Sequence, residues 1–218
     1  TGVQTCALPI SVALRRWSAD TVKAAMSSEF AGDRIGSLAP DWTDDAALDV
    51  IHRLQAAGWT QTAASGAGFG DVQPRYVFQV PLADRSLDDV FAGFNQLWRR
   101  NIRKAEKAGV VVTPGERSDL AAFHEVYVET AQRDHFTPRG LAYFERMWDE
   151  LNSMVPDRLR LYLAEHDGHL AAATLMVVVG DHAWYSYGAS TTADRDARPS
   201  NALQWRMISD AHALSCRV

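Results

Sequence analysis

Three consecutive segments with the alternation typical of β-strands constrain the fold of this chain more than any other feature. They read RLRLYLAE, HLAAATLMVVVG and HAWYSYGAS, and they cover most of residues 158–190. Asp167-Gly168, between the first two, is a strong signal for a two-residue hairpin turn. We therefore expect an antiparallel meander near the C-terminal end.

Further helical and strand patterns surround this meander. Apolar residues recur at intervals of three and four in the helical segments, and turn residues separate one segment from the next. We expect helices over 17–30, 45–57, 87–108, 118–134, 141–152 and 201–214, and strands over 72–82 and 109–113. The mixture predicts an α+β fold, and the order of its elements resembles an acyl-CoA N-acetyltransferase (GNAT)-like domain.

Composition excludes several classes of protein. The 218 residues are 47% hydrophobic and 22% charged, which is enough to bury a substantial core. The longest apolar run, residues 170–180, is about half of the roughly 20 residues that a membrane helix needs. A net charge of −5 disfavours a generally cationic nucleic-acid binder, although charge can still be segregated. The two cysteines, Cys6 and Cys216, form no metal-binding pattern, and we expect a reducing, cytoplasmic environment and no metal.

A basic ridge follows one side of the helix expected over 87–108. Five cations lie within nine residues, relieved only by Glu106: Arg99, Arg100, Arg103, Lys104 and Lys107. The helix dipole favours cations near its C-terminal end, so a solvated face explains this pattern. The alternative is a surface that contacts the phosphates of a nucleotide or RNA ligand.

Four blocks of sequence carry a more specific signal. They are NQLWRRNIRKAEKAGVVV, YVETAQRDHFTPRGLAYFERMWDEL, LYLAEHDGHLAAATLMVVVGDHAWYSYGAS and RPSNALQWRMISDAHALSCRV. In sequence and spacing, over roughly residues 71–218, they resemble the Fem-type (FemABX-like) family of peptidoglycan-bridge aminoacyltransferases. The resemblance implies tandem GNAT-like domains with mixed, largely antiparallel sheets.

The resemblance also implies an activity. Family members move an amino acid from aminoacyl-tRNA to the stem-peptide amine of a peptidoglycan precursor, either UDP-MurNAc-pentapeptide or lipid II. We therefore expect aminoacyl-tRNA as co-substrate, no cofactor, no stable protein partner, and peripheral membrane contact through a lipid-linked substrate. The roles implied are in cell-wall biogenesis and cell shape.

The chemistry of this transfer does not require a protein nucleophile. An activated ester reacts with a neutral amine when the donor is held at attack distance and the oxyanion is stabilised. No Ser-His-Asp or Cys-His arrangement stands out among the seven scattered histidines. The sequence therefore identifies no catalytic residue.

The resemblance places the strand at 182–190 beside the precursor-binding cleft. Tyr185 and Tyr187 alternate along this strand, so we expect both on one face, where their hydroxyls would bind peptide or sugar. Two core aromatics would show the same pattern. Gly188 and Ser190 would let the backbone approach a ligand.

Polar residues outside that strand complete the candidate site. Arg195, Arg198 and Asn201 flank the start of the last helix, where N–H groups and cations meet a phosphate or carboxylate, although a plain loop fits equally. Arg75 matches a QPR motif of the family and is expected at the cleft or in a surface ion pair. We expect Gln204 and Trp205 to pack the last helix.

Two other functions stay open. One is an acetyl-CoA-dependent GNAT-type N-acyltransferase, and the other is a non-catalytic fragment that binds tRNA or precursor. The loop DRDARPSN contains no glycine, which argues against the pyrophosphate cradle that CoA requires.

The two ends of the chain have their own interpretation. Residues 1–10, TGVQTCALPI, match one reading frame of a common sequencing adapter, and we expect them not to be native. By the family resemblance, residues 11–113 are expected to be the remnant of a first GNAT-like domain. Residues 114–218 are then expected to be a second such domain, truncated at its C-terminal end.

Overall fold

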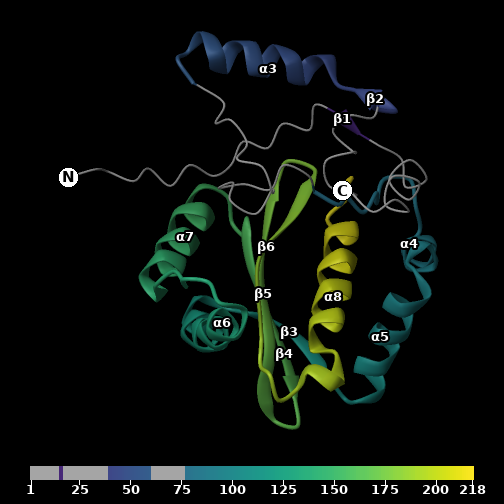
Figure 1. Ribbon diagram of the computed structural model, residues 1–218, viewed down its shortest axis with the longest axis vertical. Coiled ribbons are helices and arrows are strands. Elements are labelled where there is room, and N and C mark those ends of the chain that lie inside the picture. The colour runs from purple at the N-terminus through teal and green to yellow at the C-terminus, as the bar shows by residue number, and fades with distance from the viewer. Residues whose placement is uncertain (1–14, 17–38, 60–76) are drawn as a thin grey trace. The chain divides into compact units, whose positions relative to one another are not determined.

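The computed structural model describes residues 15–16, 39–59 and 77–218, and the chain separates into two compact units, residues 1–78 and 79–218 (Figure 1). Several expectations lie outside the described residues. They concern the first ten residues, the helix over 17–30, Arg75 and the first half of the strand over 72–82. The division into two domains at residue 113 stays a prediction.

In the first unit, a short strand pair precedes one helix. β1 (Arg15–Arg16) pairs with β2 (Trp42–Thr43) in antiparallel register, and α3 (Asp45–Ala56) follows. The Asp44 carboxylate accepts hydrogen bonds from the backbone N–H groups of the first turn, so it is the N-cap. Gly58, at a φ of +86°, follows the end of the helix, and the helix predicted over 45–57 is confirmed.

An antiparallel sheet forms the centre of the second unit. Its four strands, β3 (Val111–Gly115), β4 (Leu159–His166), β5 (His169–Val179) and β6 (His182–Ser190), lie in sequence order. Asp167 and Gly168 both have positive φ, as the predicted turn requires. The meander expected from the sequence is confirmed.

Helices cover both faces of this sheet (Figure 1). On one face lie α6 (Leu120–Asp134) and α7 (Leu141–Met154). On the other face lies α8 (Pro199–Ala213), and α5 (Gln96–Lys107) packs against the outer side of α8. Within the described residues, no helix is long and apolar enough to cross a membrane.

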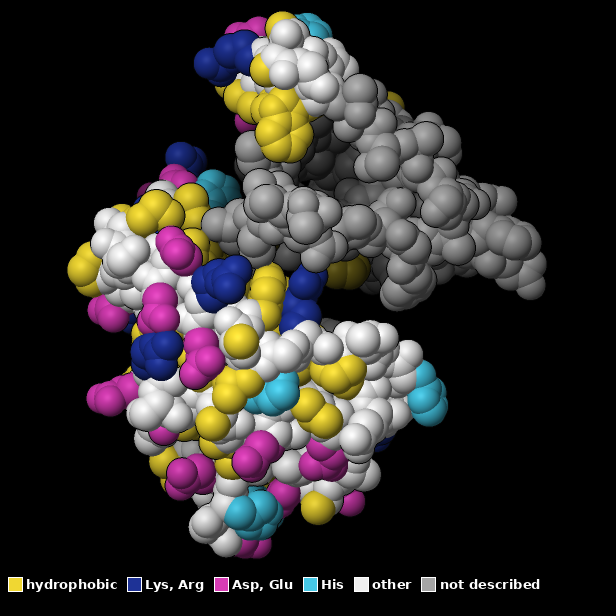
Figure 2. Space-filling view, turned by 90° about the vertical axis from the view of Figure 1, so that its left-hand side faces the viewer, with side chains coloured by type: hydrophobic (Ala, Val, Ile, Leu, Met, Phe, Trp, Pro, Cys, Tyr) yellow, Lys and Arg dark blue, Asp and Glu magenta, His cyan; other side chains and the backbone are white. Residues whose placement is uncertain are grey.

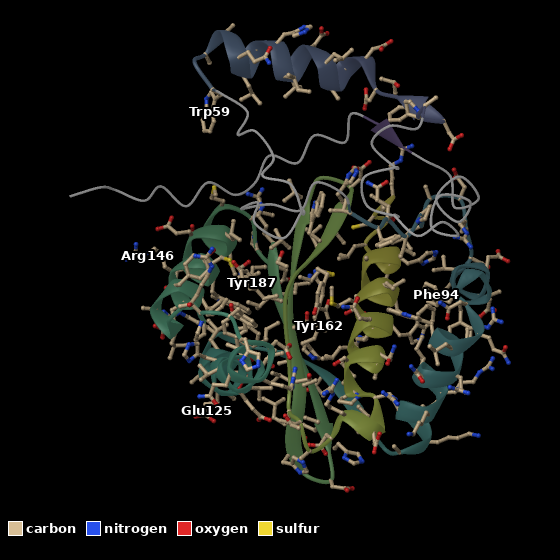
Figure 3. All side chains as sticks on the ribbon, in the orientation of Figure 1. Trp59, Phe94, Glu125, Arg146, Tyr162 and Tyr187 are labelled. Carbon is tan, nitrogen blue, oxygen red and sulfur yellow. The ribbon has the colours of Figure 1, made fainter. Side chains whose placement is uncertain are left out.

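The buried side chains of this unit form one core on each face of the sheet, and a third cluster joins Leu82 and Val90 to Ala211 of α8. Fully buried Phe144 lies at the centre of an aromatic cluster under α6 and α7, with ring-centroid distances of 5.0 Å to Phe123 and 5.1 Å to Tyr187. Under α8, Tyr162 packs with Met176 and Leu203. Figure 3 shows Tyr187 and Tyr162 on opposite sides of the sheet.

The single helix expected over 87–108 is two helices. α4 (Leu87–Gly93) ends before Phe94, and α5 begins after Asn95, whose side-chain oxygen accepts from the N–H of Trp98 at 2.8 Å. The apolar period continues through the break because Phe91 of α4 and Phe94 at the break pack on Trp205 of α8, and Trp98 of α5 packs on Phe94. Periodicity alone therefore hid an N-cap.

Residues 77–82 do not form the expected strand. Phe78 is 91% exposed, and Pro81 has no N–H to donate to a neighbouring strand. The N–H groups of Leu82 and Ala83 instead donate to the carbonyl oxygen of Arg217. The chain here is extended but is not part of a sheet in the described structure.

Candidate functional site

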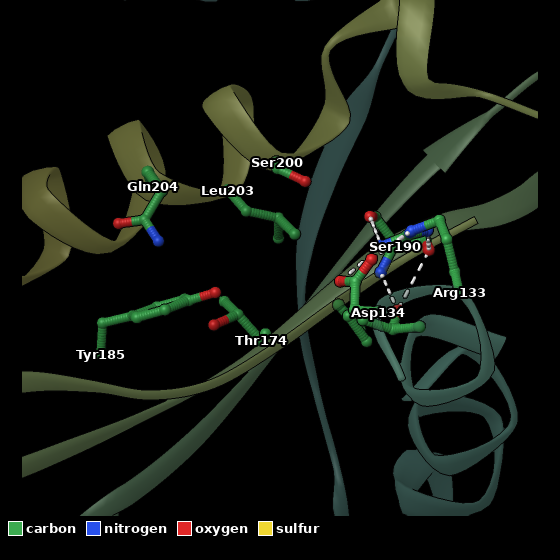
Figure 4. Close-up of a pocket in the computed structure, with 12 residues that line it drawn as sticks. Arg133, Asp134, Thr174, Tyr185, Ser190, Ser200, Leu203 and Gln204 are labelled. Atoms are coloured by element: carbon green, nitrogen blue, oxygen red, sulfur yellow. Dashed lines mark hydrogen bonds and ion pairs between the residues drawn. The ribbon is translucent and has the colours of Figure 1, made fainter. Parts of the chain in front are cut away.

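A polar pocket of about 200 Å³ lies between α8 and the β5–β6 pair. Figure 4 shows Tyr185 and Thr174 on the sheet side, Gln204 and Leu203 above them on α8, and Arg133 with Asp134 at the end of α6. The lining residues are Thr130, Arg133, Asp134, Ala173, Thr174, Tyr185, Gly188, Ala189, Ser190, Ser200, Leu203 and Gln204. Three of the predicted substrate-binding residues, Tyr185, Gly188 and Ser190, are therefore brought together here.

A β-bulge separates the two tyrosines of β6. Tyr187 pairs with Leu175, but Tyr185 pairs with the adjacent Met176, so Ser186 is an extra residue in the ladder. Such an insertion moves the side chains before it to the other face of the sheet. The expectation that both tyrosines share a face is wrong.

Tyr187 belongs to the core and not to the pocket. Its ring packs edge to face on Phe144, and its hydroxyl lies 3.0 Å from the Tyr143 hydroxyl. The alternative interpretation of the sequence, a core aromatic residue, is correct for Tyr187. It does not describe Tyr185, which is 54% exposed and lines the pocket.

The Tyr185 hydroxyl occupies the space above Gly188. A Cβ atom at position 188 would overlap this hydroxyl. Gly188 has no side chain, and the Tyr185 hydroxyl lies in the space that a side chain would fill. Desolvation raises the pKa of Tyr185, and a hydrogen bond from the Gln204 side chain acts in the opposite direction.

Hydrogen bonds to the backbone hold the floor and one wall of the pocket. Buried Thr174 donates its hydroxyl proton to the carbonyl oxygen of Tyr187 at 2.7 Å. At the wall, the Ser190 carbonyl accepts from Arg133 Nη1 at 2.7 Å and from the Thr130 hydroxyl at 3.1 Å. The N–H of Ser190 in turn donates to the Thr130 hydroxyl.

At the mouth, two charges of opposite sign neutralise each other. Arg133 Nε lies 3.0 Å from the Asp134 carboxylate, and this hydrogen bond holds the pKa of Asp134 below its usual value. Arg195 and His135 add to the same effect through their charge. The pocket therefore presents mainly neutral hydrogen-bonding groups.

The loop between β6 and α8 is fastened to the β4–β5 hairpin by a cluster that we call the Asp194 clamp. The buried Asp194 carboxylate lies 2.8 Å from His166 Nδ1 and 2.9 Å from His169 Nε2, and it accepts from the Thr191 hydroxyl. Hydrogen bonds from His166, His169 and Thr191 lower the pKa of Asp194, and Asp194 raises the pKa of His169. The clamp fixes the approach to α8.

The other predicted residues of this region do not line the pocket. Arg198 has a left-handed φ of +62° and accepts from the Asn201 N–H at the start of α8. Its Nε atom is buried and has no hydrogen-bond partner among the described residues. Neither Arg198 nor Asn201 is among the pocket residues.

The structure divides the basic ridge into two stripes. Arg99 donates to the carbonyl oxygens of Ala92 and Phe94 at 2.5 and 2.6 Å, and Arg103 lies over the Phe91 ring. These two cations support the junction of α4 and α5. Arg100, Lys104 and Lys107 lie on the exposed side of α5, and none of them forms an ion pair within the described residues.

The opposite face of the unit shows no comparable gathering of one charge. Figure 2 looks toward α6 and α7, where acidic side chains are scattered with basic ones between them. Arg117, for example, forms a bidentate ion pair with Asp149. Among the described residues, no group of three metal-binding side chains is placed to hold an ion.

Sequence reasoning missed Thr174, Gln204 and the Arg133–Asp134 pair. Thr174 was detectable, since it is the one polar residue within the apolar run of β5. Gln204 was expected to pack the helix, and only the position of α8 over Tyr185 brings it into the pocket. The expectation for Trp205 is confirmed by its contacts with Phe91 and Phe94.

Parts of this chain are similar to known proteins. The sequence model of the FemAB family matches residues 39–168. A lipid II:glycine glycyltransferase of Staphylococcus haemolyticus is 23% identical over 78% of this chain and 55% of its own length. The Staphylococcus aureus protein of the same name is 31% identical over 52% of this chain and 27% of its own length. This chain thus spans about half the length, or less, of these curated relatives.

A solved structure supports the fold. The crystal structure of FemX superposes with a TM-score of 0.68 at 20% identity, over 91% of this chain and 66% of the FemX chain. The α+β fold class with a largely antiparallel sheet, predicted from the sequence, is confirmed.

Proposed function

The chain belongs to the FemAB family, and from this premise we propose that it transfers an amino acid from aminoacyl-tRNA to the stem-peptide amine of a peptidoglycan precursor. The match of the family model over residues 39–168 carries the proposal. The names of the two staphylococcal relatives, which specify lipid II and glycine, support a lipid-linked acceptor. The work of the enzyme would then contribute to cell-wall biogenesis and cell shape, on the cytoplasmic side of the membrane.

The pocket beside β6 supports a reaction between neutral groups. Its lining offers a phenol, an amide and hydroxyls, which suit an ester carbonyl and a neutral amine. At its mouth, Arg133 and Asp134 neutralise each other, so neither strongly attracts a charged group of a substrate. We assign substrate binding in this unit to Tyr185, Gly188 and Ser190.

The exposed stripe of α5 supports binding of the tRNA. Arg100, Lys104 and Lys107 lie at i, i+4 and i+7, so they share one side of the helix, about 10 Å from first to last. Three cations along one line can neutralise the phosphates of a nucleic-acid backbone. The affinity of such a contact falls as the salt concentration rises. Arg99 and Arg103 serve the α4–α5 junction in this proposal.

The experiment follows a label from donor to acceptor. The chain is incubated with lipid II and either [¹⁴C]glycyl-tRNA or [¹⁴C]acetyl-CoA, and the lipid fraction is counted. We expect label from the aminoacyl-tRNA alone. Transfer from acetyl-CoA alone would make the protein an acetyltransferase, and binding of both substrates without transfer would make it a binding protein.

A further inference from the structure

The hydroxyl groups that line the pocket differ in their hydrogen bonds. Thr174 donates its hydroxyl proton to the Tyr187 carbonyl oxygen. The Thr130 hydroxyl lies within hydrogen-bond distance of the carbonyl oxygens of Val126 and Ser190. Arg133 is likewise committed to Ser190 and Asp134. On the sheet side of the pocket, no described residue accepts the hydroxyl protons of Tyr185 and Ser190, and the Ser190 hydroxyl oxygen already accepts from Arg133 Nη2 at 3.4 Å.

The surroundings of Tyr185 hold its hydroxyl in place. The bulge at Ser186 turns the ring toward α8, and the missing side chain of Gly188 leaves the space in which the hydroxyl lies. Gln204 of α8 faces Tyr185 across the same pocket. Because no described residue accepts the O–H proton of Tyr185, this proton is left for a ligand.

We propose that Tyr185 is a catalytic residue that donates its hydroxyl hydrogen bond to the carbonyl oxygen of the donor ester, and that Gly188 is the residue that positions it. This inference rests on the proposed function. The acceptor nitrogen attacks the ester carbon, the C–N bond forms, and the carbonyl oxygen becomes an oxyanion. The oxyanion then re-forms the carbonyl as the C–O bond to the ribose breaks, and the amine proton ends on the ribose oxygen.

Tyr185 keeps its proton throughout this sequence. Its contribution is a hydrogen bond that is stronger to the oxyanion than to the ester carbonyl, so it stabilises the transition state more than the ground state. A phenol with the ordinary pKa of a tyrosine is already in its neutral, donating form at neutral pH, and the raised pKa of Tyr185 acts in the same direction.

The test measures kcat and KM of glycyl transfer to lipid II for Tyr185→Phe. Loss of one oxyanion donor lowers kcat by about 10²–10³-fold in other enzymes, and we expect a fall of this size with KM unchanged. Gly188→Ala should lower kcat as well, since the new methyl group takes the place of the hydroxyl. Tyr162→Phe is the matched control, because Tyr162 lies under α8 but does not line the pocket.

A second measurement separates catalysis from structure. Replacement of Tyr185 by 3-fluorotyrosine keeps the shape of the side chain and makes the phenol more acidic. We expect the alkaline limb of the kcat–pH profile to move to lower pH, which a purely structural residue would not cause.

The failures are distinguishable. If the unaltered chain transfers glycine and Tyr185→Phe leaves kcat unchanged or raises only KM, the role of Tyr185 is refuted and the proposed function stands. An unshifted profile with 3-fluorotyrosine refutes it in the same way. If the unaltered chain transfers no glycine at all, the proposed function itself fails.

Discussion

Thr130 connects the last turns of α6 to the end of β6 through a single hydroxyl. The hydroxyl lies 2.9 Å from the Val126 carbonyl and 3.1 Å from the Ser190 carbonyl, and it accepts from the Ser190 N–H. Thr130 is 7% exposed, so water does not easily replace these bonds. The position of Ser190 at the pocket wall therefore depends on one buried polar group.

Replacement of Thr130 by Val should lower the free energy of unfolding by about 1–3 kcal/mol, because the part-buried N–H of Ser190 loses its acceptor. Urea denaturation measures this difference. Thr130→Ser keeps the hydroxyl and should lose much less. Equal losses for the two variants would show that packing of the methyl group, and not the hydrogen bond, stabilises the contact.

At the scale of elements, the Asp194 clamp couples the β4–β5 hairpin to the loop before α8. The raised pKa of His169 means that its contribution is complete below the ordinary value of 6.5 and is lost as the pH rises through the raised value. The lowered pKa of Asp194 means that its contribution is present above 3.8 and is lost as the pH falls through the lowered value. Between pH 3.8 and pH 6.5, His169 and Asp194 therefore both contribute fully to stability.

We therefore expect the His169→Gln variant to be less stable than the unaltered chain at pH 5.5, and the difference to shrink at pH 8.5. Chemical denaturation at the two pH values measures it. His52→Gln, on the exposed side of α3, controls for the general effect of removing an imidazole. A difference that is the same at both pH values would show that the charge of His169 does not act on Asp194.

The elements also show what a pattern can and cannot predict. The hairpin at Asp167-Gly168 follows from local turn chemistry, and it was predicted correctly. The break between α4 and α5 was missed, because Asn95 caps a helix in the middle of an unbroken apolar period. A cap is decided by which backbone groups lack partners, and the sequence of a long periodic segment does not show that.

At the scale of the whole molecule, charge is segregated although the net charge is −5. The exposed stripe of α5 carries three cations, while the side of α6 and α7 mixes both signs (Figure 2). A local positive surface on an acidic protein favours a particular anionic ligand over general binding to nucleic acid. This distribution is the physical basis of the proposed tRNA contact.

Replacement of Arg100, Lys104 and Lys107 by Gln should weaken tRNA binding and make it less dependent on salt. Three lost phosphate contacts should reduce the slope of log K against log [salt] by about 2 to 3. The matched control replaces Arg117, Arg139 and Arg146, which are three exposed cations of the other face. If both triple variants lose affinity equally, net charge and not the α5 stripe controls binding.

The sequence by itself determined the family, the antiparallel meander and most of the helices in their order, since turn residues, apolar periods and motif spacing are local properties of the chain. It also identified Tyr185, Gly188 and Ser190 as candidates for one site. Only the tertiary structure decided that Tyr185 faces the pocket and Tyr187 the core, and that Arg99 supports a helix junction. The first outcome depends on one extra residue in the β5–β6 register and on the position of α8 over the sheet, and the second depends on the break between α4 and α5, which leaves the carbonyl oxygens of Ala92 and Phe94 to accept from Arg99.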